Sequence, residues 1–283
     1  MEVKTYFDQD TATFTHLVWD GGSKQAAIID PVLDFNYRSG RTGTNSADAV
    51  ISDLKQLGLS LKYILETHAH ADHLSSAPYI KQQCGGQSGI GAKVPLVQET
   101  FRAVFNMADF ATDGSQFDLL LGEGDRLELG ELSIKVLETP GHTPACLSYQ
   151  IGDAIFIGDT FLAPRYGTAR ADFPGGDANT LYQSLERILS FPDDTRLYLC
   201  HDYPEAGKAP QYLCTVGEQR NNIHVQGSGA DDFIKLRKAR DANLEMPVLI
   251  LPAIQVNIRA GELPAPEDNG VAYLKIPLNQ IGK

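Results

Sequence analysis

The stretch Thr67–His73 reads Thr-His-Ala-His-Ala-Asp-His and gathers three imidazoles and one carboxylate into six consecutive positions. Before it, Tyr63–Glu66 is rich in β-prone residues and predicts a strand. After it, Leu74–Lys81 can start a helix, in which Pro78 is tolerated only in the first turn. The junction between a strand end and a helix start is where open sheets place ligands. Imidazole and carboxylate together suit zinc, iron, manganese or nickel better than calcium or magnesium, so the stretch predicts a transition-metal site.

A polar loop whose histidines only hydrogen-bond their neighbours is the alternative interpretation of Thr67–His73. A single histidine would favour that interpretation. Three histidines and an aspartate do not, because their partial burial without a metal would leave groups that are unsatisfied or that repel one another. We therefore prefer the metal-binding interpretation.

Three later strands are each followed by a further histidine or aspartate. These predicted strands cover Leu132–Glu138, Ala154–Ile157 and Thr195–Cys200. The segments after them read Pro-Gly-His-Thr, Gly-Asp-Thr and His-Asp-Tyr. The last two signals, each taken alone, are more typical of a turn or a helix cap. Together with the first cluster the three segments predict one composite metal site, to which they contribute His142, Asp159 and His201.

The elements that must position these donors alternate between strands and helices. Phe14–Trp19 and Gln25–Asp30 flank a Gly-Gly turn and predict a hairpin. Apolar residues at helical spacing predict helices over 47–57, 97–110 and 181–189. Residues 230–242 are predicted to form a basic helix. Ser46 can cap the first of these helices and Gly58 can end it. Residues 36–45 predict a polar loop, of a length that is often functional or mobile.

The composition bounds the class of protein. The chain has 283 residues, 42% of them hydrophobic, and no composition shift marks a domain boundary. We therefore expect one domain over 1–283, with 221–283 as a C-terminal extension packed on it. The formal charge of −12 argues against nucleic acid or an anionic membrane as a partner. The sequence shows no membrane-spanning run and no signal-peptide pattern, so we expect a cytoplasmic enzyme.

The motifs, taken in order, resemble those of the metallo-β-lactamase superfamily. They are His-x-His-x-Asp-His, Pro-Gly-His-Thr, Gly-Asp and His-Asp-Tyr, and the resemblance covers roughly residues 1–220. It implies an α/β fold of the αββα four-layer sandwich type, with the metal at the edge between two β-sheets.

Within that superfamily the chain resembles the persulfide dioxygenases related to the ethylmalonic encephalopathy protein. Thr67–His73 is similar to their Thr-His-x-His-Ala-Asp-His, and Ala169–Phe173 to their Gly-Arg-Thr-Asp-Phe. Leu199–Tyr203 is similar to their Ala-His-Asp-Tyr, where glyoxalase II proteins usually carry His-Glu-Tyr. The inserted segment 30–42 looks like a bacterial branch of the group.

The resemblance implies a mononuclear iron site. One Fe(II) per chain would be held by His68, His142 and Asp159, the facial arrangement that leaves positions open for substrate and O2. Four further residues would surround it, or would complete a second metal site as in the dinuclear zinc hydrolases of the same fold: His70, Asp72, His73 and His201.

The activity that the resemblance implies is the oxidation of glutathione persulfide by O2 to sulfite and glutathione, a step in sulfide detoxification. The carboxylates of glutathione need cations or hydrogen-bond donors, and the candidates are Arg170, Tyr203, Arg220 and Arg165. The first two rest on motif resemblance.

A zinc-dependent glutathione thioester hydrolase, similar to glyoxalase II, is the alternative. The oligomeric state is left open, with a homodimer as one option.

Overall fold

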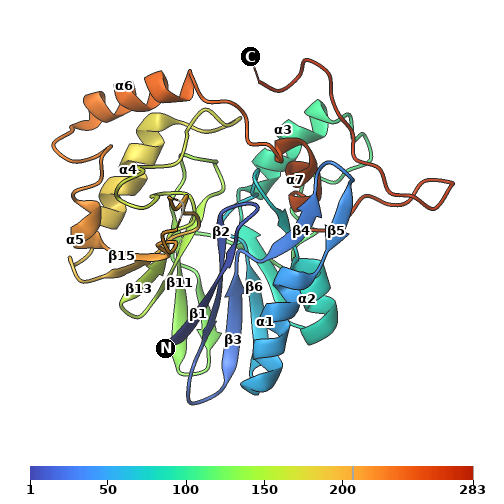
Figure 1. The fold of residues 1–283 in the computed structure, drawn as a ribbon, viewed down its shortest axis with the longest axis horizontal. Coiled ribbons are helices and arrows are strands. Elements are labelled where there is room, and N and C mark those ends of the chain that lie inside the picture. The colour runs from blue at the N-terminus through green and yellow to red at the C-terminus, as the bar shows by residue number, and fades with distance from the viewer. Residues whose placement is uncertain (206, 283) are drawn as a thin grey trace.

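Two β-sheets face each other in the middle of the molecule, and helices cover the outer face of each (Figure 1). The computed structural model describes residues 1–205 and 207–282. Apolar side chains between the sheets form the central core, among them Val18 and Ile29 from one sheet and Val136, Tyr149 and Phe156 from the other. The αββα sandwich implied by the motifs is confirmed.

The first sheet holds the N-terminal strands and then the strand that leads to the histidine cluster. Its spatial order is β1 (Glu2–Asp8), β2 (Thr13–Trp19), β3 (Gln25–Ile29), β6 (Ser60–Leu65), β8 (Gln87–Gly91) and β9 (Leu119–Leu121). Strands β1 to β3 pair antiparallel, which confirms the hairpin, and β3 to β9 pair parallel. The helices connecting the parallel strands are α1 (Asn45–Gln56), α2 (Ala77–Cys84) and α3 (Val94–Val104).

The second sheet carries the other predicted donors at its strand ends. Its order is β10 (Arg126–Leu129), β11 (Leu132–Glu138), β12 (Leu147–Ile151), β13 (Ala154–Phe156), β14 (Arg196–Tyr198) and β15 (Leu213–Thr215). Only β13 and β14 pair parallel. The helices on this side are α4 (Ala178–Leu189), α5 (Val216–Gln219) and α6 (Ala230–Asp241). Leu181 and Leu185 of α4 pack against Ile155 and Leu197 of the sheet.

The prediction that residues 36–45 form a polar loop is wrong. They form the tip and second strand of a hairpin. This hairpin joins β4 (Val32–Asn36) to β5 (Arg41–Gly43), and β4 also pairs with β7 (Leu74–Ser75). The reason is local turn chemistry. The side chain of Asn36 accepts hydrogen bonds from the backbone N–H groups of Arg38 and Ser39, and Gly40 takes the positive φ of 65° that closes the turn.

Two helix starts also differ from prediction. Helix α1 begins at Asn45, and Ser46 does not cap it; instead, the Asp34 carboxylate of β4 accepts from the backbone N–H groups of both residues. A neighbouring strand thus satisfies these N–H groups. Helix α3 begins at Val94, three residues earlier than predicted, with a proline in its first turn, and ends at Val104. Pro78 lies in the first turn of α2, as predicted.

The C-terminal region contacts both halves of the sandwich. Phe233 of α6 packs in the core beneath α4, whereas Ile254 of α7 (Ile250–Asn257) packs with Phe101 of α3. Figure 1 shows α6 beside α4 and α7 near α3. The extension boundary at residue 221 stays a prediction. No helix among the described residues is long and apolar enough to span a membrane.

His16 connects the first sheet to the end of β14, next to His201, and its burial should make the stability of the fold depend on pH. Its Nε2–H donates to the carbonyl of Leu199 and its Nδ1 accepts from the Thr5 hydroxyl, both at 3.0 Å. Burial lowers the pKa of His16 from 6.5 to about 4. Because folding lowers the pKa of His16, the contribution of its neutral ring to the free energy of unfolding is fully present above pH 6.5. About 3 kcal/mol of this free energy is lost as the pH falls toward 4.

The test compares urea unfolding of the wild type and of His16→Gln, whose amide can still donate to Leu199 but does not titrate. Between pH 7 and pH 4 the wild type should lose about 3 kcal/mol more unfolding free energy than the variant. Equal losses in the two proteins would show that His16 does not supply this pH dependence.

Candidate metal centre

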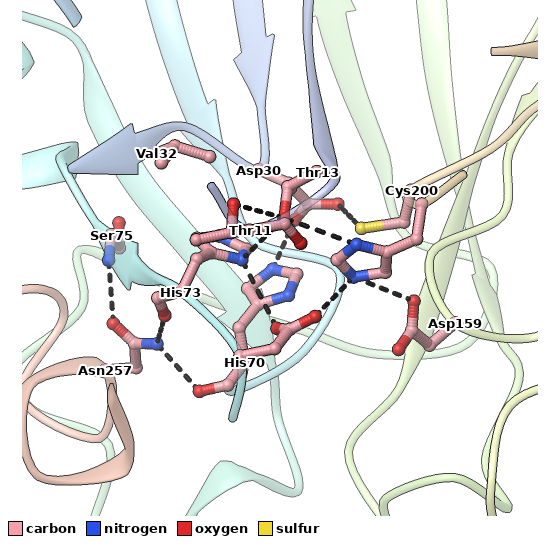
Figure 2. A network of polar contacts seen from close by, with 12 residues as sticks. Thr11, Thr13, Asp30, Val32, His70, His73, Ser75, Asp159, Cys200 and Asn257 are labelled. Atoms are coloured by element: carbon pink, nitrogen blue, oxygen red, sulfur yellow. Dashed lines mark hydrogen bonds and ion pairs between the residues drawn. The ribbon is translucent and has the colours of Figure 1, made fainter. Parts of the chain in front are cut away.

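All seven predicted donors converge at one edge of the sandwich, between the two sheets. Four of them, His68, His70, Asp72 and His73, lie in the connection between β6 and β7. The other three follow strands of the second sheet: His142 follows β11, Asp159 follows β13 and His201 follows β14. Figure 2 shows Asp159 on the side of the cluster away from His73. The strand exits therefore bring together residues that are more than a hundred positions apart.

His68, His142 and Asp159 form one compact donor group, with all three ligand atoms within 4.8 Å of one another. Asp159 Oδ2 lies 3.9 Å from Nε2 of His68 and 3.8 Å from Nε2 of His142. Two donors that bind one ion at about 2.1 Å each can be at most about 4.2 Å apart. Both distances to Asp159 are below this limit, so Asp159 can share one metal ion with either histidine.

The remaining donors lie beside this group. Nε2 of His201 is 2.9 Å from Oδ2 of Asp72 and 3.4 Å from Oδ1 of Asp159. Two donor atoms here are buried and have neither a hydrogen-bond nor an ion-pair partner among the described residues: His70 Nδ1 and His73 Nε2. Orphaned buried polar atoms are costly. A cation would satisfy them, so the residues present fit a bound metal.

Hydrogen bonds at the far side of each imidazole fix which nitrogen is free to bind a metal. The Nδ1–H of His68 donates to the Thr67 hydroxyl at 3.0 Å, and the Nδ1–H of His142 donates to the carbonyl of Arg170 at 2.8 Å. In both rings Nε2 is thus left with its lone pair. His70 is oriented the other way, because its Nε2–H donates to Asp30. Such supporting bonds set the tautomer and orientation of ligand histidines.

Asp30 is a supporting residue that sequence reasoning missed. It is 2% exposed and accepts hydrogen bonds from the Thr67 amide, the Thr67 hydroxyl and His70 Nε2, at 2.7, 2.9 and 2.9 Å. Figure 2 shows it above the histidine cluster. Burial would raise its pKa, but His70 and the Thr67 amide outweigh that effect and lower it. The only sequence signal was an aspartate before a proline at a strand end.

The charges in the cluster are arranged to attract a cation. Burial and the neighbouring imidazoles of His70 and His142 lower the pKa of His68 well below its ordinary value. At His201 burial also lowers the pKa, but Asp72 and Asp159 overcome it and raise that pKa to about 9. The imidazole of His68 is therefore neutral, as a metal ligand requires. The carboxylates of Asp72 and Asp159 favour a positive charge beside them.

A cavity of about 830 Å³ opens onto the donor group. His68, His142 and Asp159 line it, and so does Asp72, whereas the other three histidines of the cluster do not. A volume of this size accommodates a small-molecule ligand. Four arginines also line the cavity: Arg38, Arg170, Arg237 and Arg240. Asp10 and Glu245 line it as well, so the cavity carries charges of both signs, and its arginines offer cations to an anionic ligand although the chain has a net charge of −12.

The predicted substrate contacts divide into two groups. Arg170 and the half-exposed Tyr203 line the cavity. Arg165 and Arg220 are not among the described residues that line it. Arg165 instead pairs with the fully buried Asp202, next to His201, at 2.6 Å, and Arg220 donates to Asp193 at 2.8 Å on the surface. The structure therefore does not bring these two arginines to the donor group.

The segment that carries Arg170 is held in place from α6. Arg237 donates to the carbonyl of Thr168 at 3.0 Å and pairs with Asp241 at 2.6 Å. Asp241 in turn accepts from the backbone N–H of Ala171 at 2.9 Å. Since the Arg170 carbonyl accepts the hydrogen bond from His142, this buried ion pair supports one of the three donors from a distance. Sequence reasoning identified α6 as a basic helix but not this contact.

A family model described as Metallo-beta-lactamase superfamily matches residues 9–201. The chain belongs to this superfamily, whose fold and donor cluster indicate a metal cofactor. Among its relatives is a probable metallo-hydrolase of Burkholderia pseudomallei, 53% identical over 99% of this chain and 100% of the relative. The chain spans only 65% of a beta-lactamase hydrolase-like protein of Agrobacterium fabrum, with which it is 51% identical.

Two further relatives carry different functional names. Glyoxylase B2 of Dictyostelium discoideum is 46% identical over 99% of this chain and 98% of its own length. The mitochondrial persulfide dioxygenase ETHE1 of Homo sapiens is 30% identical over 92% of this chain and 88% of its own. The resemblance to the persulfide dioxygenases is thus confirmed, alongside similarity to proteins with hydrolase names.

Two solved structures extend the comparison. ETHE1 from Myxococcus xanthus superposes with a TM-score of 0.74 at 29% identity, covering 93% of this chain and 100% of that protein. A protein solved in a di-iron-bound form gives a TM-score of 0.56 at 25% identity, covering 78% of this chain and 98% of that one. The fold is therefore shared with a protein that holds iron.

Proposed function

We propose that this protein is a non-heme Fe(II) persulfide dioxygenase that oxidises glutathione persulfide with O2 to sulfite and glutathione. The observation that carries the proposal is the donor group His68, His142 and Asp159, which presents two imidazoles and one carboxylate to a cavity that is also lined by arginines. Two imidazoles and one carboxylate are the facial set of non-heme iron oxygenases. The similarity to ETHE1 proteins supports the same chemistry.

The iron, when bound, would bring the persulfide sulfur and O2 together and accept and return the electrons that the sulfur supplies. The chain's own residues do the rest. Thr67, Asp30 and the Arg170 carbonyl keep Nε2 of His68 and of His142 unprotonated and aimed at one point. Asp159 contributes the negative charge that balances the ion. No nicotinamide or flavin is needed, because the sulfur itself is the reductant.

The overall reaction consumes one O2 and one water per persulfide and releases one thiol, one sulfite and two protons. The terminal sulfur is oxidised and its bond to the thiol sulfur breaks. The cavity must therefore admit O2 and water as well as the thiol. Arg170 lines it with a side chain that is 10% exposed and paired with Asp172. A partly desolvated guanidinium of this kind can hold an anionic substrate.

The test is oxygen uptake by protein purified without added zinc. We expect about one iron per chain, by the logic of the facial set, and oxygen consumption that starts when glutathione persulfide is added and yields sulfite. Hydrolysis of a glutathione thioester, measured on the same sample, should be negligible. Thioester hydrolysis without oxygen uptake would reject the proposal.

A zinc-dependent glutathione thioester hydrolase is the second candidate, and one observation favours it. His70 and His73 lie beside the first donor group, each with a buried ring nitrogen that has no partner among the described residues, and Asp72 and His201 lie next to them, so the chain keeps the residues for a second ion. The relative named glyoxylase B2 points the same way.

Replacing Asp72 separates the two candidates. On the dioxygenase proposal Asp72→Ala keeps its single iron, because Asp72 lies outside the facial set, and oxygen uptake falls by about tenfold, the usual cost of removing a group that supports a ligand. A bridged pair of ions would lose metal on the same substitution. Metal analysis of the purified variant decides, with loss of metal favouring the hydrolase.

A further inference from the structure

His224 lines the cavity outside the donor cluster, and its contacts fix the state of its ring. The residue is 2% exposed. The backbone N–H of Thr168 donates to its Nδ1 at 3.0 Å. Because a backbone N–H can only donate, Nδ1 must keep its lone pair, and the single proton of the neutral ring is on Nε2. His224 thus offers the cavity a neutral N–H donor.

That donor is unsatisfied by the protein. Nε2 of His224 is buried and has no hydrogen-bond partner in the described part of the chain. Burial, together with the positive charges of Arg237 and Arg240, lowers the pKa of His224 to about 4, so the ring stays neutral near pH 7. A buried donor without an acceptor is unfavourable. A ligand that fills the cavity can supply the missing acceptor.

Arg240 adds an uncompensated charge to the same part of the cavity. Arg170 and Arg237 line it too, but each is paired with a carboxylate, Asp172 and Asp241 respectively. Within residues 1–205 and 207–282 no carboxylate forms an ion pair with Arg240, which is exposed near the end of α6. Its charge is therefore available to a ligand.

We propose that His224 and Arg240 form a carboxylate-binding subsite that holds the anionic part of the thiol while its sulfur faces the metal donors. The inference rests on the proposed function. A carboxylate has two acceptor oxygens, of which one can accept from Nε2 of His224 and the other from the Arg240 guanidinium. Charge-assisted hydrogen bonds of this kind are both strong and directional. The subsite selects acidic thiols over neutral ones of equal size.

Three variants of the full-length protein test the subsite. His224→Asn keeps an oxygen that can accept from the Thr168 amide but removes the Nε2–H donor. Arg240→Gln removes the charge. Lys238→Gln removes the same charge from the same helix but outside the cavity lining, and serves as the matched control. The substrates are glutathione persulfide and the persulfide of glutathione diethyl ester, in which both carboxylates are masked.

His224→Asn and Arg240→Gln should each lower kcat/KM for glutathione persulfide about tenfold, the usual effect of losing a hydrogen bond to a charged group. The change should be in KM rather than kcat, with iron content unchanged. Turnover of the diethyl ester should match that of the wild type in both variants. Lys238→Gln should match the wild type on both substrates. Equal losses on the two substrates, or no loss on either, would overturn the subsite.

A binding measurement separates failure of the subsite from failure of the proposed function. Calorimetric titration with glutathione itself requires no turnover. If the wild type binds glutathione about tenfold more tightly than both variants do, the subsite stands even where no oxygen is consumed. If the wild type consumes oxygen but binds glutathione no better than the two variants, the subsite is wrong and the dioxygenase proposal stands.

Discussion

Asp159→Ala is expected to yield a folded protein that binds less than a tenth of the wild-type iron and has lost oxygen uptake. The reason is that Asp159 supplies the only carboxylate of the donor group, and both of its imidazole partners approach the same oxygen, at 3.9 and 3.8 Å. Removing a residue that merely supports a ligand commonly costs 10–100-fold. Removing a ligand should therefore lower kcat/KM by more than about a hundredfold.

Metal analysis and an oxygen electrode give the two readouts. Asp153→Ala is the control, because Asp153 lies at the opposite end of β13 from Asp159 and forms an ion pair with Arg196 at the surface. That variant should keep its full iron content and its oxygen uptake. An Asp159→Ala protein with normal iron content would exclude Asp159 as a ligand.

Arg237→Met is expected to cost about 3–5 kcal/mol of unfolding free energy, because it leaves the buried carboxylate of Asp241 without its cation. Both side chains of this pair are nearly inaccessible, at 2% and 6% exposure. The loss should also weaken metal binding, by about tenfold. The reason is that Arg237 and Asp241 hold the segment whose Arg170 carbonyl fixes His142.

Urea unfolding and a metal titration measure the two effects. The double variant Arg237→Met/Asp241→Leu should recover part of the stability, since replacing both buried charges by apolar groups is often tolerated. Arg196→Met, which breaks the exposed pair with Asp153, should cost less than about 1 kcal/mol. Additive losses in the double variant would show that the two charges do not interact.

The donor cluster could be predicted because each donor lies shortly after the end of a strand that the local sequence predicts. Each predicted strand is marked by its own residues, and His142, Asp159 and His201 each come within four residues of the end of one. Strands β11, β13 and β14 run in the same direction, so their exits reach the same edge of the second sheet. The convergence of these residues with His68 thus follows from the fold that the motifs imply.

The supporting residues could not be predicted, because their roles depend on contacts between distant segments. Asp30 accepts a hydrogen bond from Thr67, which is 37 positions later in the chain. Arg237 donates a hydrogen bond to Thr168, which is 69 positions earlier. Neither residue carries a local signal for its partner. The same reason explains the start of α1, which is satisfied by Asp34 from a neighbouring strand rather than by Ser46. Arg165 and Arg220 carry the charge that a glutathione carboxylate needs, but charge alone does not say which way a side chain points.

The division of the donors between the two sheets has a consequence for biosynthesis. His68 is translated long before His142 and Asp159, so a nascent chain cannot assemble the three-residue group until Asp159 has been made. An ion captured earlier would have to rely on the donors of the first sheet alone. By the same reasoning, cutting the chain anywhere between residues 74 and 141 would produce two fragments, and neither would contain the whole group.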